Sequence, residues 1–129
     1  MRWGLGELRG RRIAGVHALH SRAKCTEQKR HWDYNPDLLE GRRTTKPASA
    51  ILALEPGSRI IFFPNEFLAS GRVPTLLNPG DLLVFDGDVS HAGASYALPN
   101  TRVHVYLDVP GLKREAGVVW FKRIRHRVV

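Results

Sequence analysis

The chain has 129 residues, of which 43% are hydrophobic and 25% charged, and its formal net charge at pH 7 is +8. This length and balance predict one globular domain with its own core and exclude a disordered chain. The single cysteine, Cys25, excludes an internal disulfide, and no apolar run reaches the length of a membrane span. The first residues lack the apolar core of a signal peptide. We therefore expect one domain over 1–129, either complete or part of a longer chain, in an intracellular, cytoplasmic setting.

The excess positive charge gathers at both ends of the chain, and 110–129 is predicted to form a basic C-terminal extension. Such charge suits anionic partners, including nucleic acid. A solvated basic surface is favoured over nucleic-acid binding, because the sequence has no basic helix and no aromatic-plus-basic RNA-binding signature. We expect a small-molecule substrate as the partner, and the sequence does not specify an oligomeric state.

Turn signals divide the chain into short runs rich in Val, Ile, Leu, Phe and Tyr. Pro-Gly or Pro-Asn pairs mark turns within 55–58, 78–81 and 98–101, and such runs between turns are typical of half-buried strands. Strands are predicted at about 12–19, 24–31, 48–55, 58–63, 73–77, 80–86, 88–95 and 101–109. Helical turns are expected only near 1–10 and 36–43. This pattern predicts an all-β sandwich or jelly roll with little helix.

The stretch KRHWDYNP places two metal-binding residue types two positions apart. In a strand, His31 and Asp33 point to the same face and Trp32 to the other. An imidazole and a carboxylate suit Fe(II), Zn or Mn. The best candidate for a third ligand is His91, which lies 58 residues beyond Asp33 (91 − 33) in the run DGDVSHAGASY. Taken alone, the pair is better explained as the polar end of a strand, and His91 and Arg102 in strand order turn the balance toward a metal site.

A further candidate, Arg102, opens the predicted strand 101–109. Two histidines and a carboxylate on a β scaffold can form a facial triad that leaves three coordination positions open. Strand alternation places Arg102, His104 and Tyr106 on one face. A guanidinium that faces the interior is costly to leave unpaired, and a carboxylate ligand would satisfy it through two hydrogen bonds.

In this order, H31-W-D33, H91 and R102 resemble the Fe(II)- and 2-oxoglutarate-dependent dioxygenases. The run GDLLVFDGDVSHAGASYALPNTRVHVYLD is similar to the phytanoyl-CoA dioxygenase-like branch, and the resemblance covers about residues 24–109. It implies a double-stranded β-helix, a cupin-like jelly roll of about eight strands. It also implies that His31, Asp33 and His91 hold Fe(II), that Arg102 pairs with the distal carboxylate of 2-oxoglutarate, and that O₂ binds the remaining position. The implied reaction hydroxylates a substrate and releases succinate and CO₂.

The sequence departs from the family pattern at three places. Many relatives have Arg-x-Ser where this chain has Arg102-Val103-His104, so His104 either takes the place of the hydroxyl or fills the core. Tyr106 either donates to the cosubstrate or fills the barrel. Pro64-Asn65-Glu66 stands where relatives often read Pro-Gly-Ser-His, and the N-terminal helices of relatives are reduced to about ten residues.

The segment 34–47 is the predicted lid of the metal site. Its candidate substrate-binding residues are Tyr34, Arg42, Arg43 and Lys46. A basic lid would suit an anionic substrate, such as one that carries phosphate or coenzyme A, although the same charges also serve to solvate a loop. Two other functions stay open: a zinc- or manganese-binding cupin-like protein without 2-oxoglutarate, and a non-catalytic jelly-roll module that binds anionic ligands or nucleic acid through its basic surface.

Overall fold

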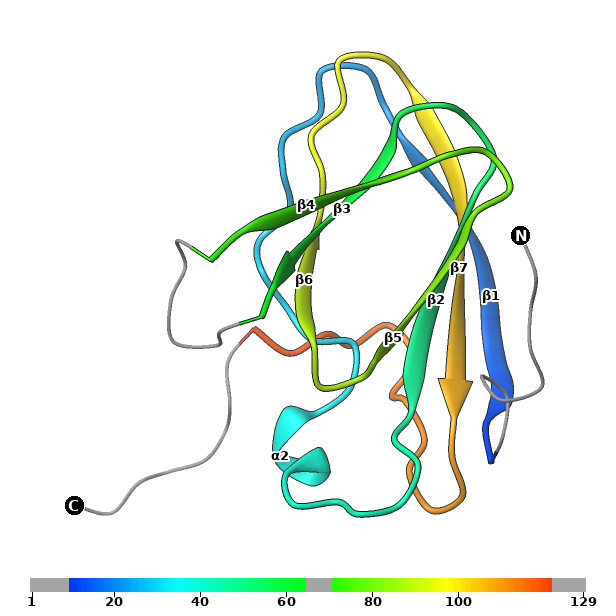
Figure 1. The fold of residues 1–129 in the computed structure, drawn as a ribbon, viewed down its shortest axis with the longest axis vertical. Coiled ribbons are helices and arrows are strands. Elements are labelled where there is room, and N and C mark those ends of the chain that lie inside the picture. Colours follow the sequence, from blue (N-terminus) through cyan, green and yellow to red (C-terminus); the bar gives the residue numbers. More distant parts are fainter. Residues whose placement is uncertain (1–9, 65–70, 122–129) are drawn as a thin grey trace.

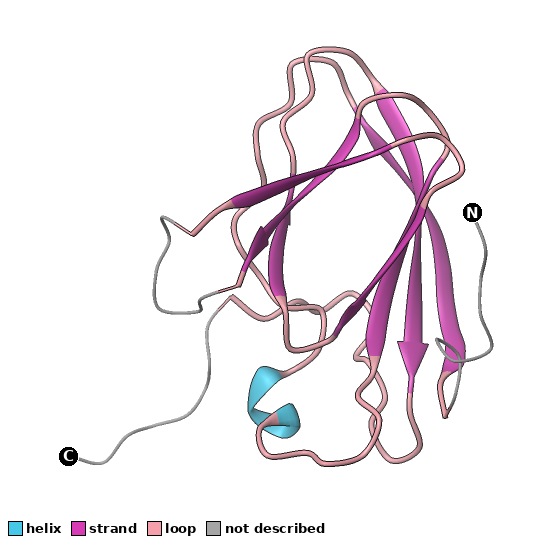
Figure 2. Ribbon diagram, in the orientation of Figure 1, coloured by secondary structure: helices cyan, strands magenta, loops and turns pink. Residues whose placement is uncertain are grey.

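The computed structural model describes residues 10–64 and 71–121. Residues 1–9, 65–70 and 122–129 lie outside it, and with them most of the predicted helical turn at 1–10, Asn65-Glu66 and the end of the basic extension. The described residues form seven strands and one short helix: β1 (Arg12–Ser21), α2 (Pro36–Leu39), β2 (Ala48–Ala53), β3 (Ser58–Phe63), β4 (Val73–Leu77), β5 (Leu82–Asp86), β6 (Ser90–Gly93) and β7 (Asn100–Asp108). The predicted all-β jelly roll is confirmed (Figures 1 and 2).

Two antiparallel sheets face each other, with strand orders β1-β7-β2-β5 and β4-β3-β6. The chain passes from one sheet to the other between β2 and β3 and again between β4 and β5, β5 and β6, and β6 and β7. Gly57 and Gly80, at the turns predicted from Pro-Gly pairs, have φ of 84° and 88°, which glycine adopts without steric cost. The Gly80 amide donates to the Ala53 carbonyl at 2.8 Å. This hydrogen bond joins the connection between β2 and β3 to the connection between β4 and β5. Repeated crossing between two sheets is the jelly-roll arrangement.

The prediction of a regular strand at 24–31 is wrong. This segment follows the outer edge of β6 but forms no regular ladder with it: Cys25 bridges Tyr96, beyond β6, and His31 bridges His91. The Gln28 amide donates to the Gly93 carbonyl at 2.9 Å, but the Gly93 amide donates to the Gln28 side-chain oxygen, also at 2.9 Å. Because a side chain accepts where a backbone carbonyl would continue a ladder, the edge is irregular. The described residues thus hold seven regular strands instead of about eight.

The predicted helical turn at 36–43 is present but shorter, since α2 ends at Leu39. The Asn35 side chain accepts from the Asp37 amide at 3.0 Å and caps the start of the helix. Beyond Leu39 the backbone becomes extended, and Gly41 has a φ of 74° that does not continue a helix.

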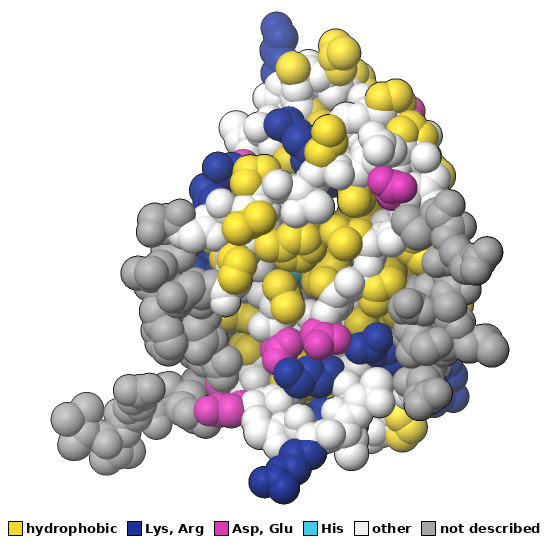
Figure 3. Space-filling view, viewed as in Figure 1, with side chains coloured by type: hydrophobic (Ala, Val, Ile, Leu, Met, Phe, Trp, Pro, Cys, Tyr) yellow, Lys and Arg dark blue, Asp and Glu magenta, His cyan; other side chains and the backbone are white. Residues whose placement is uncertain are grey.

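Buried apolar side chains form two clusters, one between the sheets and one on the outer side of the smaller sheet. The first cluster joins the two sheets and consists of Ile51, Ala53, Ile60, Leu77 and Phe85. The second consists of Ile61, Phe63, Ala92, Ala94 and Tyr96, and Cys25 packs against it. On the face shown in Figure 3, hydrophobic side chains gather in the middle of the molecule. No helix among the described residues is long and apolar enough to cross a membrane.

Candidate metal centre

His31 and His91 are held side by side by their own backbones. The amide of each donates to the carbonyl of the other at 2.9 Å, and the two rings lie 4.6 Å apart between centroids. On the other side, Trp32 forms a similar bridge with Trp120. The Trp32 side chain turns away, whereas His31 and Asp33 both line the central cavity. The alternation predicted from the spacing of these residues therefore holds over 31–33.

The donor atoms of His31, Asp33 and His91 lie within 4.8 Å of one another. His31 Nε2 is 3.7 Å from Asp33 Oδ1, and His91 Nε2 is 3.3 Å from Asp33 Oδ2. Asp33 and His91 are only 2% and 3% exposed. The three residues singled out in the sequence thus meet in one buried His-Asp-His cluster, which fits a metal-binding facial triad.

Backbone carbonyls determine which nitrogen of each neutral ring carries the proton. His31 Nδ1 lies 2.8 Å from the Lys29 carbonyl, and His91 Nδ1 lies 3.2 Å from the Val89 carbonyl. A carbonyl can only accept, so in a neutral ring Nδ1 carries the proton and Nε2 keeps its lone pair. His91 Nε2 is buried, and no described residue forms a hydrogen bond with it. A metal ion is a partner that this lone pair fits, and a carbonyl behind the ring is the usual support of a ligand histidine.

Electrostatics favour a charged Asp33. Burial by itself raises the pKa of Asp33, but attraction to His104 and His91 outweighs it and holds that pKa well below the usual value. Ser49 also donates to Asp33 Oδ2 at 2.7 Å. Burial, with the neighbouring His91, lowers the pKa of His31. The result is a charged carboxylate beside two imidazoles, a donor set that suits a divalent cation.

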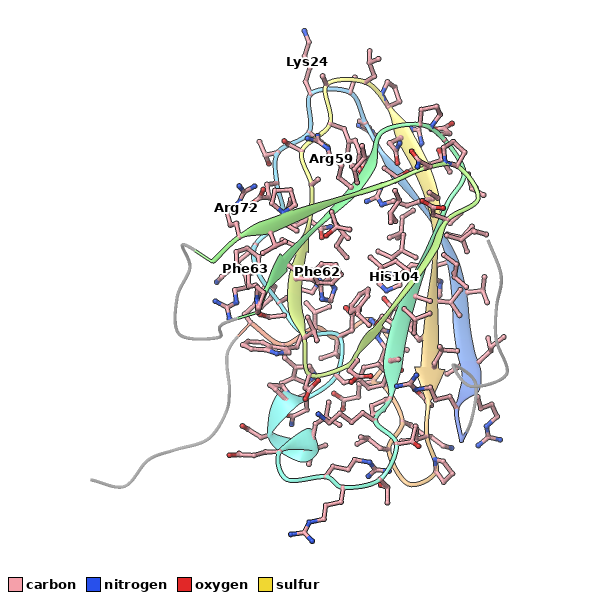
Figure 4. All side chains as sticks on the ribbon, in the orientation of Figure 1. Lys24, Arg59, Phe62, Phe63, Arg72 and His104 are labelled. Carbon is pink, nitrogen blue, oxygen red and sulfur yellow. The ribbon has the colours of Figure 1, made fainter. Side chains whose placement is uncertain are left out.

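A cavity of about 410 Å³ opens beside this cluster, between the two sheets. His31, Asp33 and His91 line it on one side, and β7 lines it with Arg102, His104 and Tyr106. Figure 4 labels His104, whose side chain lies in the space between the sheets. The common inward face predicted for these three β7 residues is therefore confirmed.

Arg102 is buried in this cavity, and no described residue is a charged partner for it. Arg102 is 5% exposed. Its Nη1 donates to Ser21 Oγ at 3.0 Å, and its guanidinium lies 5.1 Å from the centre of the Tyr96 ring. Among the described residues, no carboxylate pairs with it. The guanidinium therefore keeps hydrogen-bonding capacity for an anion in the cavity.

Two side chains at Asp33 were not predicted. His104 Nε2 lies 3.3 Å from Asp33 Oδ2, although the sequence offered His104 only as a cosubstrate-binding or core residue. Ser49 bonds the same oxygen. The signal for Ser49 was a polar residue inside the apolar run ASAILA, whereas no local pattern shows which residue of β7 lies beside Asp33.

The residues of the predicted lid are not in the cavity wall. None of Tyr34, Arg42, Arg43 and Lys46 is among its lining residues. Lys46 Nζ pairs with Asp88 at 2.6 Å, and the Tyr34 hydroxyl donates to Asp108 at 2.8 Å. Tyr34 instead lines a second cavity of about 300 Å³, which Asp33 also borders.

The described part of the predicted basic extension packs back on the barrel. Val119 and Phe121 line the central cavity, and Lys29 Nζ lies 4.9 Å from the centre of the Phe121 ring. No role for Lys29 or Phe121 could be predicted, because no local pattern shows that the chain returns to the barrel here. Residues 122–129 lie outside the described part.

No protein-family model and no curated protein matches the sequence. Solved structures do match. The non-heme monooxygenase of a ThoJ–Ni complex aligns with a TM-score of 0.55 and 14% identity, over 81% of this chain and 47% of that one. A prolyl 4-hydroxylase from Phytophthora capsici aligns with a TM-score of 0.50 and 16% identity, over 74% of this chain and 32% of that one. A prolyl 4-hydroxylase from Pseudomonas putida aligns with a TM-score of 0.45 and 21% identity, over 78% of this chain and 52% of that one.

The chain shares its jelly-roll fold with the non-heme monooxygenase. At these identities the likeness shows the fold alone, and the chain spans about half or less of the length of each of these structures. The narrower resemblance to the phytanoyl-CoA dioxygenase-like branch stays a prediction.

Proposed function

We propose that this protein is a non-haem Fe(II)- and 2-oxoglutarate-dependent dioxygenase that hydroxylates a small anionic substrate and releases succinate and CO₂. The observation that carries the proposal is the buried, unpartnered Nε2 of His91, which faces the carboxylate of Asp33 beside His31. The fold shared with a non-heme monooxygenase supports it. Fold alone does not imply function, so the argument rests on the site.

His31, Asp33 and His91 would hold the iron, each through an atom that already faces the others. Bound iron supplies the activation of O₂, coupled to oxidation of 2-oxoglutarate. The protein fixes the donors beforehand: the Lys29 and Val89 carbonyls orient the two rings. Such supporting contacts typically change metal affinity by about 10- to 100-fold when they are lost.

Arg102 would bind the distal carboxylate of 2-oxoglutarate. The planar guanidinium offers a carboxylate two parallel hydrogen bonds, and burial strengthens the attraction because little water competes with it. Tyr96 and Ser21 hold the guanidinium in place. Tyr106, two positions beyond His104, forms part of the cavity wall.

The charge of the cavity supports an anionic substrate. Lys29, Arg59 and Arg102 line it, and Asp33 is the only acidic residue among its described lining. Charges of one sign around a cleft attract ligands of the other sign. A covering role for the segment 34–47 would require movement, because Lys46 and Tyr34 are bound elsewhere.

The test begins without oxygen. Metal-free protein is loaded with Fe(II), and 2-oxoglutarate is then added while the visible spectrum is recorded; chelation of the iron is expected to produce a weak absorption band. Air and a panel of anionic substrates are then admitted, and iron-dependent formation of succinate is measured. Asp33→Asn should show neither signal, whereas His20→Ala, at an exposed position on β1, should show both. An unchanged spectrum after 2-oxoglutarate is added would contradict the proposal.

One observation favours a second candidate, a zinc- or manganese-binding cupin-like protein without 2-oxoglutarate. A third imidazole, that of His104, stands beside Asp33. Metal analysis of the purified protein, together with calorimetric titration of 2-oxoglutarate into each metal-loaded form, separates the candidates. Binding of 2-oxoglutarate to the Fe(II) form supports the dioxygenase, and zinc or manganese without such binding supports the second candidate.

A further inference from the structure

His104 has no role in the proposed function, yet its Nε2 is placed like that of His91. Each Nε2 is buried without a hydrogen-bond partner among the described residues, and each lies 3.3 Å from the same atom, Asp33 Oδ2. His104 is 6% exposed, in the middle of the central strand β7. The burial of Nε2 and its distance from Asp33, two of the observations that support His91 as a ligand, therefore hold for His104 as well.

Direct hydrogen bonding to Asp33 does not account for this arrangement. Oδ2 already accepts from Ser49 Oγ at 2.7 Å, and a carboxylate oxygen has two lone-pair directions. It cannot also accept well-directed hydrogen bonds from both His91 and His104, and neither ring makes one. A buried polar atom left without a partner costs about 1–3 kcal/mol.

A metal ion would satisfy both rings at once. Ligands about 2.1 Å from a metal and at right angles to each other lie about 3 Å apart. The separation of 3.3 Å between Asp33 Oδ2 and each Nε2 is close to this value. The rings and the carboxylate are thus spaced as neighbouring ligands of one ion.

We propose that His104 is a fourth ligand, so that the centre consists of three histidines and one carboxylate. This inference rests on the metal centre proposed above. Four protein ligands leave two positions of an octahedron instead of three. A bidentate keto acid and O₂ together need three, so 2-oxoglutarate and His104 would compete for the metal. His104 stands where the family pattern has serine, two residues from Arg102, which places this competition at the cosubstrate site.

The test is an NMR count of ligand histidines. Protein labelled with ¹⁵N at histidine is titrated with Zn(II), a diamagnetic probe, because metal-bound, protonated and free imidazole nitrogens have separate ¹⁵N chemical shifts. Three Nε2 signals are expected to move to the metal-bound region in the wild type, and His104→Asn should retain two. The control His20→Asn changes an exposed histidine that bonds to Thr101, and it should keep all three.

Two results overturn the inference and differ in their consequence. Two metal-bound signals in the wild type, with His104 Nε2 protonated, would make His104 a hydrogen-bond donor to Asp33 and leave the proposed metal centre intact. No metal-bound signal would overturn the metal centre as well. The wild-type spectrum alone decides between these outcomes, whether or not the variants fold.

A second measurement tests the competition. Calorimetric titration of 2-oxoglutarate into the Zn(II)-loaded His104→Ser variant, which restores the Arg-x-Ser pattern, should give a lower dissociation constant than the wild type. A dissociation constant equal to or higher than that of the wild type would contradict the proposed competition between 2-oxoglutarate and His104.

Discussion

At the scale of single residues, the site consists of buried polar atoms that other protein groups do not satisfy. Asp33 is a buried carboxylate, and the nitrogens of His91 and His104 that face it have no hydrogen-bond partner in the part of the chain that the structure describes. Arg102 is a buried cation without a carboxylate among the described residues. Since unpaired buried polar groups are destabilising, their concentration around one cavity indicates ligands: a cation beside Asp33 and an anion beside Arg102.

Replacement of Arg102 by lysine should weaken 2-oxoglutarate binding without affecting the metal. Lysine keeps the charge but loses the fork that holds a carboxylate through two bonds. We expect the dissociation constant of 2-oxoglutarate to rise about 10- to 100-fold, equivalent to roughly 1.4–2.8 kcal/mol. Anaerobic titration of the Fe(II)-loaded protein measures it. Arg72→Lys, at an exposed arginine paired with Glu27, is the matched control. Equal dissociation constants in Arg102→Lys and the control would argue against a cosubstrate role.

At the scale of elements, the site depends on a segment that is neither strand nor helix. Residues 31–35 run between β6, which holds His31, and the end of β7, where the Tyr34 hydroxyl donates to Asp108. Trp120, from the chain beyond β7, fixes Trp32 between them. Asp33 is therefore positioned by contacts on both sides of a short irregular stretch.

Tyr34→Phe should loosen this stretch and destabilise the protein by about 1–3 kcal/mol at pH 8, because Asp108 loses a buried donor. Burial, together with Asp108, raises the pKa of Tyr34 above the ordinary tyrosine value of about 10. The unfolded chain therefore loses this proton first as the pH rises, so the contribution of Tyr34 is present below about pH 10 and falls above it.

Urea denaturation of the wild type and Tyr34→Phe at pH 8 and at about pH 11 measures both effects. The difference in free energy of unfolding should be smaller at the higher pH. A difference that is equal at both values would show that the phenolic proton plays no part.

At the scale of the whole molecule, the candidate metal centre joins parts that are distant in the sequence. His31 and His91 belong to the side of the smaller sheet, while His104 and Ser49 reach Asp33 from the larger sheet. A metal bound here would connect the two sheets across the cavity.

Metal binding should therefore stabilise the fold. At a free metal concentration about 100 times the dissociation constant, the free energy of unfolding should rise by about 2.7 kcal/mol. Thermal unfolding with and without Zn(II) measures the shift in midpoint, and Asp33→Asn should remove it. A shift of equal size in Asp33→Asn would mean that the metal binds elsewhere.

Much of this arrangement could be predicted from the sequence, since its signals are local. The Pro-Gly turns predicted where neighbouring strands begin and end, and 58–63 and 73–77 are strands as predicted. The spacing of His31 and Asp33 predicted their common direction. The approach of His104 to Asp33 could not be predicted, because it depends on how the two sheets face each other. The irregular course of 24–31 depends on one Gln28 side chain that replaces a ladder carbonyl.

The most direct test of the central claim, that His31, Asp33 and His91 hold one divalent metal, is calorimetric titration of the metal-free protein with Fe(II) under argon. We predict one Fe(II) per chain in the wild type and in His20→Ala, and at least about a 100-fold loss of affinity, the upper end of supporting-contact effects, in His91→Ala. Unchanged Fe(II) binding by His91→Ala would contradict the account.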